Sequence, residues 1–254
     1  MKKGKPEYLY KYRPINRHTL NMILFNDVYF SLPIEFNDPF DCNTIPNLIY
    51  TEEEKEKYRF NLMNDVKNTQ EVFNSLGNDI EKTFEDGWKY TFNNIRNNLR
   101  IFCLSEVNNN VMMYSHYADS HKGICLEFKV TDDPFWEEVE YVRYKNNVPD
   151  FHPFHNDIKF IHKELIEIET LIKSCTWSYE NEWRIIKDGP YPMIHKFPSN
   201  ILTSIIFGYQ TSTEDKLFIQ RIIEKRTTSI QLKEVVKKEK SFELEIKPYQ
   251  LIND

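Results

Sequence analysis

Hydrophobic residues recur at regular spacings along parts of the chain, and these spacings predict helices. From Phe73 to Leu99 they return every three or four positions, which indicates one long helix or two helices that break near Gly77. The same spacing from Ile158 to Ile172 predicts another helix. Thr51 is followed three residues later by a glutamate, as in a capping box, so a helix is expected to begin there.

Eight other segments are short, rich in β-branched and aromatic residues and often alternating, which predicts strands. They are residues 28–31, 101–105, 123–130, 139–144, 182–187, 201–207, 229–236 and 242–246. Because helices do not alternate regularly with these strands, the pattern favours an α+β fold with a mixed, largely antiparallel sheet and inserted helices. No linker is apparent, so residues 1–254 are expected to form a single domain with a helical insertion at about 51–100.

Composition narrows the function classes. The 254 residues include 33 Lys+Arg and 39 Asp+Glu, giving a net charge of −6, so nucleic acid would have to bind in a local basic cleft rather than through bulk charge. Only six glycines occur and none cluster, which argues against glycine-rich phosphate loops. The apolar runs fall far short of the roughly 20 residues that cross a bilayer. Four cysteines without CxxC spacing fit reduced thiols, and we expect a cytoplasmic protein without a membrane partner.

Two cations near the start of the chain are candidate ligands for phosphate. If residues 9–13 are extended, Lys11 and Arg13 share one side of the strand, and Tyr10 and Tyr12 share the other. Such a strand can bind a diphosphate, because guanidinium groups donate paired hydrogen bonds to phosphate oxygens. The alternative interpretation is a solvated strand edge.

Two acids lie where a predicted strand begins, and they are the candidate catalytic groups. Glu180 and Glu182 stand two residues apart among aromatic residues. One carboxylate at such a junction can hold a ribose hydroxyl and stabilise an oxocarbenium ion, while the other receives the proton of an incoming nucleophile. The alternative interpretation is a surface ion pair between Glu182 and Arg184.

The remaining polar clusters have simpler interpretations. Residues 36–41 are dense in turn formers, so we expect Asp38 and Asp41 to bond backbone N–H groups or neighbouring cations rather than a metal. Asn110 is a good helix N-cap for a short helix that carries His116 and Tyr117, both candidates to line a pocket. The sequence therefore predicts no metal site.

Taken in order, these clusters resemble the uncharacterised prokaryotic family named domain of unknown function 2971. The resemblance spans about residues 8–210. It rests on the segments 9–13, 28–31, 36–41, 102–106, 113–119, 122–123 and 177–184. This family implies no established activity.

A more distant resemblance is to ADP-ribosyltransferase-like proteins. Their pattern is a basic or His residue on a first strand, an aromatic residue or Ser on a second, and a catalytic Glu near a later strand. Segments 10–13, 29–31 and 180–182 occupy those places, with Lys11 where His is frequent. The resemblance implies that NAD is contacted by Lys11, Arg13, Tyr29, Ser31 and Tyr117. It also implies that Glu182 binds the ribose and Glu180 assists the acceptor.

The leading hypothesis is thus a bacterial ADP-ribosyltransferase-like enzyme, such as a toxin or phage-defence effector, that cleaves NAD at the nicotinamide ribose bond. NAD is its substrate, no metal is expected, and the acceptor is water or a macromolecule, either protein or nucleic acid. An antitoxin is an expected partner. Two alternatives stay open: a non-catalytic nucleotide-binding or sensor module, and a metal-dependent nuclease that uses Asp38, Asp41 and histidines. The hypothesis requires the strands that follow Tyr29 and begin at Glu182 to be neighbours around one cleft.

Overall fold

The computed structural model describes residues 3–57, 80–154, 158–189 and 191–251. The chain forms two compact units. Unit 1 comprises Met1–Ser31, Arg100–Tyr144 and Cys175–Asp254, and unit 2 comprises Leu32–Leu99 and Lys145–Ser174. The expectation of a single domain stays a prediction, and the two units are described separately.

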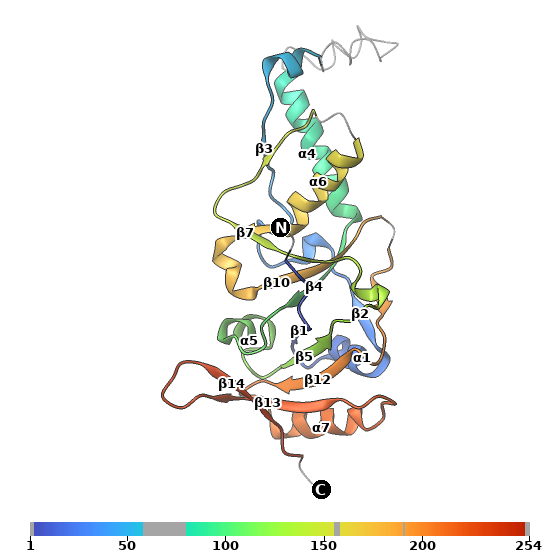
Figure 1. The fold of residues 1–254 in the computed structure, drawn as a ribbon, viewed down its shortest axis with the longest axis vertical. Coiled ribbons are helices and arrows are strands. Elements are labelled where there is room, and N and C mark those ends of the chain that lie inside the picture. Colours follow the sequence, from blue (N-terminus) through green and yellow to red (C-terminus); the bar gives the residue numbers. More distant parts are fainter. Residues whose placement is uncertain (1–2, 58–79, 155–157, 190, 252–254) are drawn as a thin grey trace. The chain divides into compact units, whose positions relative to one another are not determined.

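Unit 1 is built on an eight-stranded sheet with the order β14-β13-β12-β5-β1-β4-β10-β6 (Figure 1). The strands are β1 (Tyr8–Arg13), β4 (Arg100–Ser105), β5 (Ile124–Lys129), β6 (Val139–Tyr141), β10 (Glu182–Lys187), β12 (Leu202–Phe207), β13 (Gln231–Lys237) and β14 (Leu244–Pro248). Within this sheet β12 and β13 run parallel and the other neighbours run antiparallel. The predicted α+β fold with a mixed, largely antiparallel sheet is confirmed.

Helices cover both faces of this sheet. On one face α1 (Arg17–Phe25) and α7 (Thr213–Ile223) contribute buried Met22, Ile23, Ile219 and Ile222 to the larger apolar core. On the other, α5 (Val111–Tyr117) packs Met113 and Tyr114 into a second cluster. As predicted, the Asn110 side chain caps α5 by accepting hydrogen bonds from the backbone of Met112 and Met113.

Strands β1 and β4 separate in the middle of the sheet. All six residues of β1 pair with β5, but only Tyr10 pairs with β4, opposite Ser105. Farther along β4, Ile101 instead exchanges both of its backbone hydrogen bonds with Ser31. Beyond Tyr10, therefore, β1 and β4 are no longer paired with each other, and this unpaired stretch is here called the β1/β4 gap.

Short elements complete unit 1. The 3-10 helices η2 (Pro134–Trp136) and η3 (Cys175–Glu180) lead into strands, and β2 (Asp27–Tyr29) pairs with β11 (Ile194–Lys196) in a two-stranded sheet. Strand β7 (Arg143–Lys145) contains the boundary between the two units.

Unit 2 contains α4 (Ile80–Asn98) and α6 (Ile158–Leu171), with η1 (Pro33–Glu35), β3 (Asn47–Leu48), β8 (Asp150–Phe151) and β9 (Ile172–Ser174). The rings of Trp88 and Phe92 on α4 lie 5.1 and 6.0 Å from that of Phe151. Arg96 on α4 forms a bidentate pair with buried Glu169 on α6, with N–O distances of 2.7 and 3.0 Å. Aromatic packing and this ion pair hold the two helices together.

Several helix predictions are confirmed and some boundaries differ. Thr51 forms the expected capping box, since its backbone N–H and hydroxyl donate to Glu54, whose N–H donates to the Thr51 hydroxyl. The helix expected up to Ile172 ends at Leu171, and Ile172 begins β9. The part of the long periodic stretch before residue 80, including Gly77, lies outside the described residues.

Candidate functional site

Lys11 and Arg13 lie on β1 beside the β1/β4 gap. The Lys11 ammonium donates to the carbonyl of Cys103 at 2.7 Å and lies 5.1 Å from the centre of the Phe102 ring. Tyr12 faces the other way, where its hydroxyl donates to Val107 and its ring packs 4.8 Å from that of Tyr114. The predicted division of this strand into a basic side and an aromatic side is therefore observed.

Both cations are partly or largely buried, and burial governs their protonation. The pKa of Lys11 is lowered to about 8, chiefly by burial; the charges of Arg13 and Arg184 contribute to the lowering, and Cys103 and Glu182 oppose it. Burial also lowers the pKa of Arg13. The Nε atom of Arg13 is buried without a hydrogen-bond partner. Within the described ranges no carboxylate forms an ion pair with either cation, so both keep the capacity to bind an anion.

Glu182 is the first residue of β10 and is paired with Arg184 on the same strand. Arg184 Nε lies 2.8 Å from Glu182 Oε1 and Arg184 Nη2 lies 2.9 Å from Oε2. The side chains are 7% and 0% exposed. The pair considered as the alternative interpretation thus forms, but in the interior rather than at the surface. The backbone N–H of Glu182 also donates to the hydroxyl of Tyr144 at 2.9 Å.

Glu180, at the end of η3, is buried in a separate hydrogen-bonded arrangement. Its carboxylate accepts a short hydrogen bond of 2.6 Å from Tyr117 of α5. Its backbone carbonyl accepts another, also 2.6 Å, from the hydroxyl of Ser105. Asn181 between the two acids has a left-handed backbone, with φ of 43°, so the chain turns sharply there. Glu180 thus accepts a hydrogen bond from Tyr117, and Glu182 accepts from Arg184.

The segment that carries these acids matches a family model. Residues 113–185 match the family described as protein of unknown function (DUF2971). This confirms the resemblance predicted for this family. No curated protein and no solved structure matches the chain. The DUF2971 match includes Tyr117, Glu180 and Glu182, whereas the predicted NAD contacts on β1 and β2 lie outside it.

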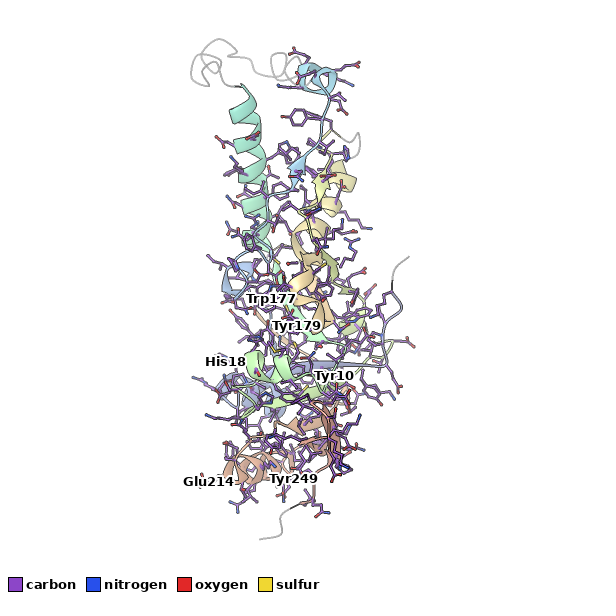
Figure 2. The ribbon with its side chains drawn as sticks, turned by 90° about the vertical axis from the view of Figure 1, so that its left-hand side faces the viewer. Tyr10, His18, Trp177, Tyr179, Glu214 and Tyr249 are labelled. Carbon is purple, nitrogen blue, oxygen red and sulfur yellow. The ribbon has the colours of Figure 1, made fainter. Side chains whose placement is uncertain are left out.

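Aromatic residues of the DUF2971 segment gather near Glu180. Exposed His116 lies 6.2 Å from the ring of Trp177 and 6.3 Å from that of Tyr179, and these two rings are 6.0 Å apart. Figure 2 shows Trp177 and Tyr179 next to each other. The sequence analysis assigned no role to either residue. Their position in the chain just before Glu180 and Glu182 could have indicated one.

The strand register places the cations and the acids on opposite faces of the sheet. Tyr10 opposes Ser105, and Ser105 opposes Glu182, so these three share a face. Lys11 and Arg13, one position away, belong to the other face. The Lys11 ammonium nevertheless reaches Cys103 on β4, and the charge of Glu182 acts on its pKa. Glu182 thus acts on Lys11 electrostatically from the opposite face of the sheet.

Tyr29 and Ser31 lie on other elements. Tyr29 pairs with Ile194 of β11, and its hydroxyl is 3.9 Å from the sulfur of Met193. The backbone of Ser31 forms two hydrogen bonds with the backbone of Ile101 on β4. Strand β10 is the other neighbour of β4 and pairs along its length. The expectation that the strands following Tyr29 and beginning at Glu182 are neighbours is therefore wrong, because β4 lies between them. A site that joins β1 to β10 must extend across β4 and does not need Tyr29 or Ser31.

The turn at residues 36–41 belongs to unit 2. Asp38 Oδ1 accepts the backbone N–H of Phe40 at 3.0 Å, and Asp41 forms an ion pair with Lys173 at 3.1 Å. Both interactions are of the kinds predicted for a turn. Among the residues that the structure describes, no group of three or more His, Cys, Asp or Glu is arranged to hold a metal. Nor is any described helix both long and apolar enough to cross a membrane.

Proposed function

We propose that this chain is an ADP-ribosyltransferase-like enzyme that binds NAD and cleaves its nicotinamide ribose bond. The observation that carries the proposal is the pair of cations on β1, Lys11 and Arg13, which lie beside the β1/β4 gap without a carboxylate partner among the residues that the structure describes. A buried cation without a counter-charge is unfavourable, and an anionic ligand relieves that cost. Arg13 in addition offers a buried N–H donor that lacks an acceptor.

The diphosphate of NAD suits these two cations. A guanidinium donates to phosphate oxygens in a planar, paired geometry, and an ammonium adds a compact positive charge. Lys11 already donates one hydrogen bond to Cys103 and has three N–H bonds in its charged form, so it can serve the protein and the ligand together. This assignment makes the β1/β4 gap the diphosphate end of the site.

Glu180 and Glu182, which lie in the segment 113–185 that matches DUF2971, are assigned the catalytic roles. Arg184 fixes the orientation of Glu182, and the Glu182 carboxylate is assigned to the ribose hydroxyl. In the reaction the glycosidic C–N bond breaks, its electron pair leaves with nicotinamide, and the sugar carbon bonds to the acceptor. Glu180 accepts the proton of the acceptor, and Tyr117 supports it by a hydrogen bond.

The acceptor and the biological setting belong to the same proposal. The acceptor is water or a macromolecule, either protein or nucleic acid. A cytoplasmic toxin or phage-defence effector of bacteria, held inactive by an antitoxin, is the setting that the resemblance to ADP-ribosyltransferase-like proteins implies. NAD enters as substrate, and the chemistry as written uses no metal.

One observation favours a second candidate, a nucleotide-binding module without catalysis. Both oxygens of Glu182 accept from Arg184, and this pairing balances much of the negative charge that a catalytic carboxylate needs. The cations of β1 would bind a nucleotide equally well in a sensor. The two candidates therefore share a ligand and differ in turnover.

Titration of the full chain with NAD by calorimetry, combined with an assay of nicotinamide release, separates them. Binding together with release supports the enzyme. Binding without release, with and without bacterial lysate as a source of acceptors, supports the sensor. Absence of NAD binding overturns the enzyme and leaves a module that binds another nucleotide.

A further inference from the structure

Unit 2 contains a pocket of about 210 Å³ that the proposed NAD site does not use. Its walls come from the turn that begins at Asp38, from residues 145–149 and from the junction of α6 with β9. All of these segments belong to unit 2. The pocket therefore lies entirely within this unit.

Asp38 supplies an unsatisfied acceptor in the wall of this pocket. The residue is 6% exposed, and its Oδ1 is occupied by the backbone N–H of Phe40. Its Oδ2 is buried and has no hydrogen-bond partner. A buried carboxylate oxygen that has lost its water and gained no donor is costly to the folded protein. A ligand with a donor group removes this cost.

The other buried charges of the pocket already balance each other. Asp41 and Lys173 are 3.1 Å apart, and each side chain is 4% exposed. Lys145 also lines the pocket but is exposed to solvent. The buried groups thus comprise two acids and one base. Asp38 gives the interior of the pocket an excess of negative charge, which favours a cation.

The remaining wall is largely apolar. Pro149, Ile168 and Ile172 contribute aliphatic surface, and the more exposed Phe40 and Val148 lie at the same pocket. Apolar walls with one charged group are the usual construction of a site for an amphipathic small ligand. The walls match an alkyl chain, and Asp38 matches a charged end.

We propose that this pocket binds an aliphatic chain that ends in an ammonium or guanidinium group, with Asp38 Oδ2 accepting the terminal N–H. A free alkylamine and the side chain of a lysine or arginine in another protein share this chemistry. The site is independent of the proposed NAD chemistry, because none of its residues belongs to unit 1.

The test is calorimetric titration of the full chain with n-butylammonium, agmatine and a capped lysine amide, with n-butanol as the uncharged control. The wild-type protein is expected to bind the charged probes and not butanol. Asp38→Asn keeps the acceptor for Phe40 and removes the charge, so affinity should fall about tenfold to a hundredfold. Asp86→Asn, at an exposed acid of α4 outside the pocket, should leave affinity unchanged.

A second variant covers the case in which Asp38→Asn does not fold. Val148→Trp enlarges a side chain that is 42% exposed and lines the pocket, so it should block binding without disturbing a core. Equal affinity for the free amines and the capped lysine indicates a protein side chain as the ligand, and preference for the free amines indicates a small molecule. The proposal is overturned if no charged probe binds, if butanol binds as well as butylammonium, or if both variants bind like the wild type.

Discussion

Arg184 and Glu182, two residues apart on β10, form a bidentate ion pair inside unit 1, with N–O distances of 2.8 and 2.9 Å. Residues two apart on a strand share a face, and here the short spacing lets the guanidinium fold back onto the carboxylate. Each charge makes the burial of the other tolerable. Any chemistry of Glu182 must therefore operate with Arg184 attached.

This pairing predicts a large stability cost for removing the cation alone. Arg184→Met removes the bidentate partner of buried Glu182, and the free energy of unfolding should fall by about 3 to 5 kcal/mol. Urea denaturation measures it. The double variant Glu182→Leu with Arg184→Met should recover part of the loss, because no isolated charge remains. A single variant as stable as the double would contradict the prediction.

Glu182 itself tests the proposed chemistry. Glu182→Gln keeps an acceptor for Arg184 and the size of the side chain but removes the negative charge near the forming oxocarbenium ion. NAD should still bind, while nicotinamide release should fall about a hundredfold or more. Circular dichroism must show an intact fold, since Arg184 loses its counter-charge. Loss of NAD affinity without loss of turnover at saturation would argue against the assigned role.

Glu180 should behave differently from Glu182, because it is assigned a different task and its carboxylate accepts a hydrogen bond from Tyr117. Glu180→Gln should impair transfer to a macromolecular acceptor and leave hydrolysis by water, since its proposed task is to receive the proton of the nucleophile. The measurement compares labelled ADP-ribose on acceptor with free ADP-ribose. Tyr117→Phe is the matched variant, and it should weaken transfer in the same direction but less.

The parts of the fold that are visible in the sequence are those set by local spacing. The capping box at Thr51, the cap at Asn110 and the helical stretch Ile158–Leu171 follow from residues three or four positions apart, whereas the end of that helix before Ile172 does not. Strands such as β3, β8, β9 and β11 contain two or three residues and carry too little pattern to be recognised. Their pairing depends on distant segments.

The candidate site was predictable only as separate fragments. Alternation correctly divides Lys11 from Tyr12 on β1, because that is a local property of a strand. Whether Lys11 and Glu182 share a face of the sheet depends on the pairing of Tyr10 with Ser105 and of Ser105 with Glu182. This register joins three strands that are far apart in the chain. The single residue pair between β1 and β4 also joins segments that are far apart in the chain, as does the ion pair between Asp41 and Lys173. Neither can be predicted from local spacing.

Lys11 makes the affinity for NAD dependent on pH. Burial lowers its pKa to about 8, so in the free protein the ammonium loses its charge as the pH rises through that value. Only the charged form attracts a diphosphate, so the dissociation constant should be constant below about pH 7, rise as the pH passes through 8, and level off near the value for Lys11→Met, because Arg13 still binds the diphosphate. Calorimetry between pH 6.5 and 9.5 measures it. Lys11→Met should bind more weakly, and its affinity should not change over this range.

Arg13 gives the sharpest separation between binding and stability. It is a partly buried cation with no carboxylate partner among the described residues and with a buried Nε that donates to nothing. Replacing it by methionine therefore breaks no ion pair and removes a desolvated charge, so Arg13→Met should be as stable as the wild type or more stable, in contrast to Arg184→Met.

The same substitution should weaken NAD binding at least about tenfold, because a charged hydrogen bond to the diphosphate is lost. Arg17→Met is the matched control, since Arg17 is an exposed cation at the start of α1 and should alter neither property. Urea denaturation and NAD calorimetry on the three proteins provide the two readouts. If Arg13→Met destabilises the fold while NAD affinity is unchanged, Arg13 has a structural role and the diphosphate assignment on β1 is wrong.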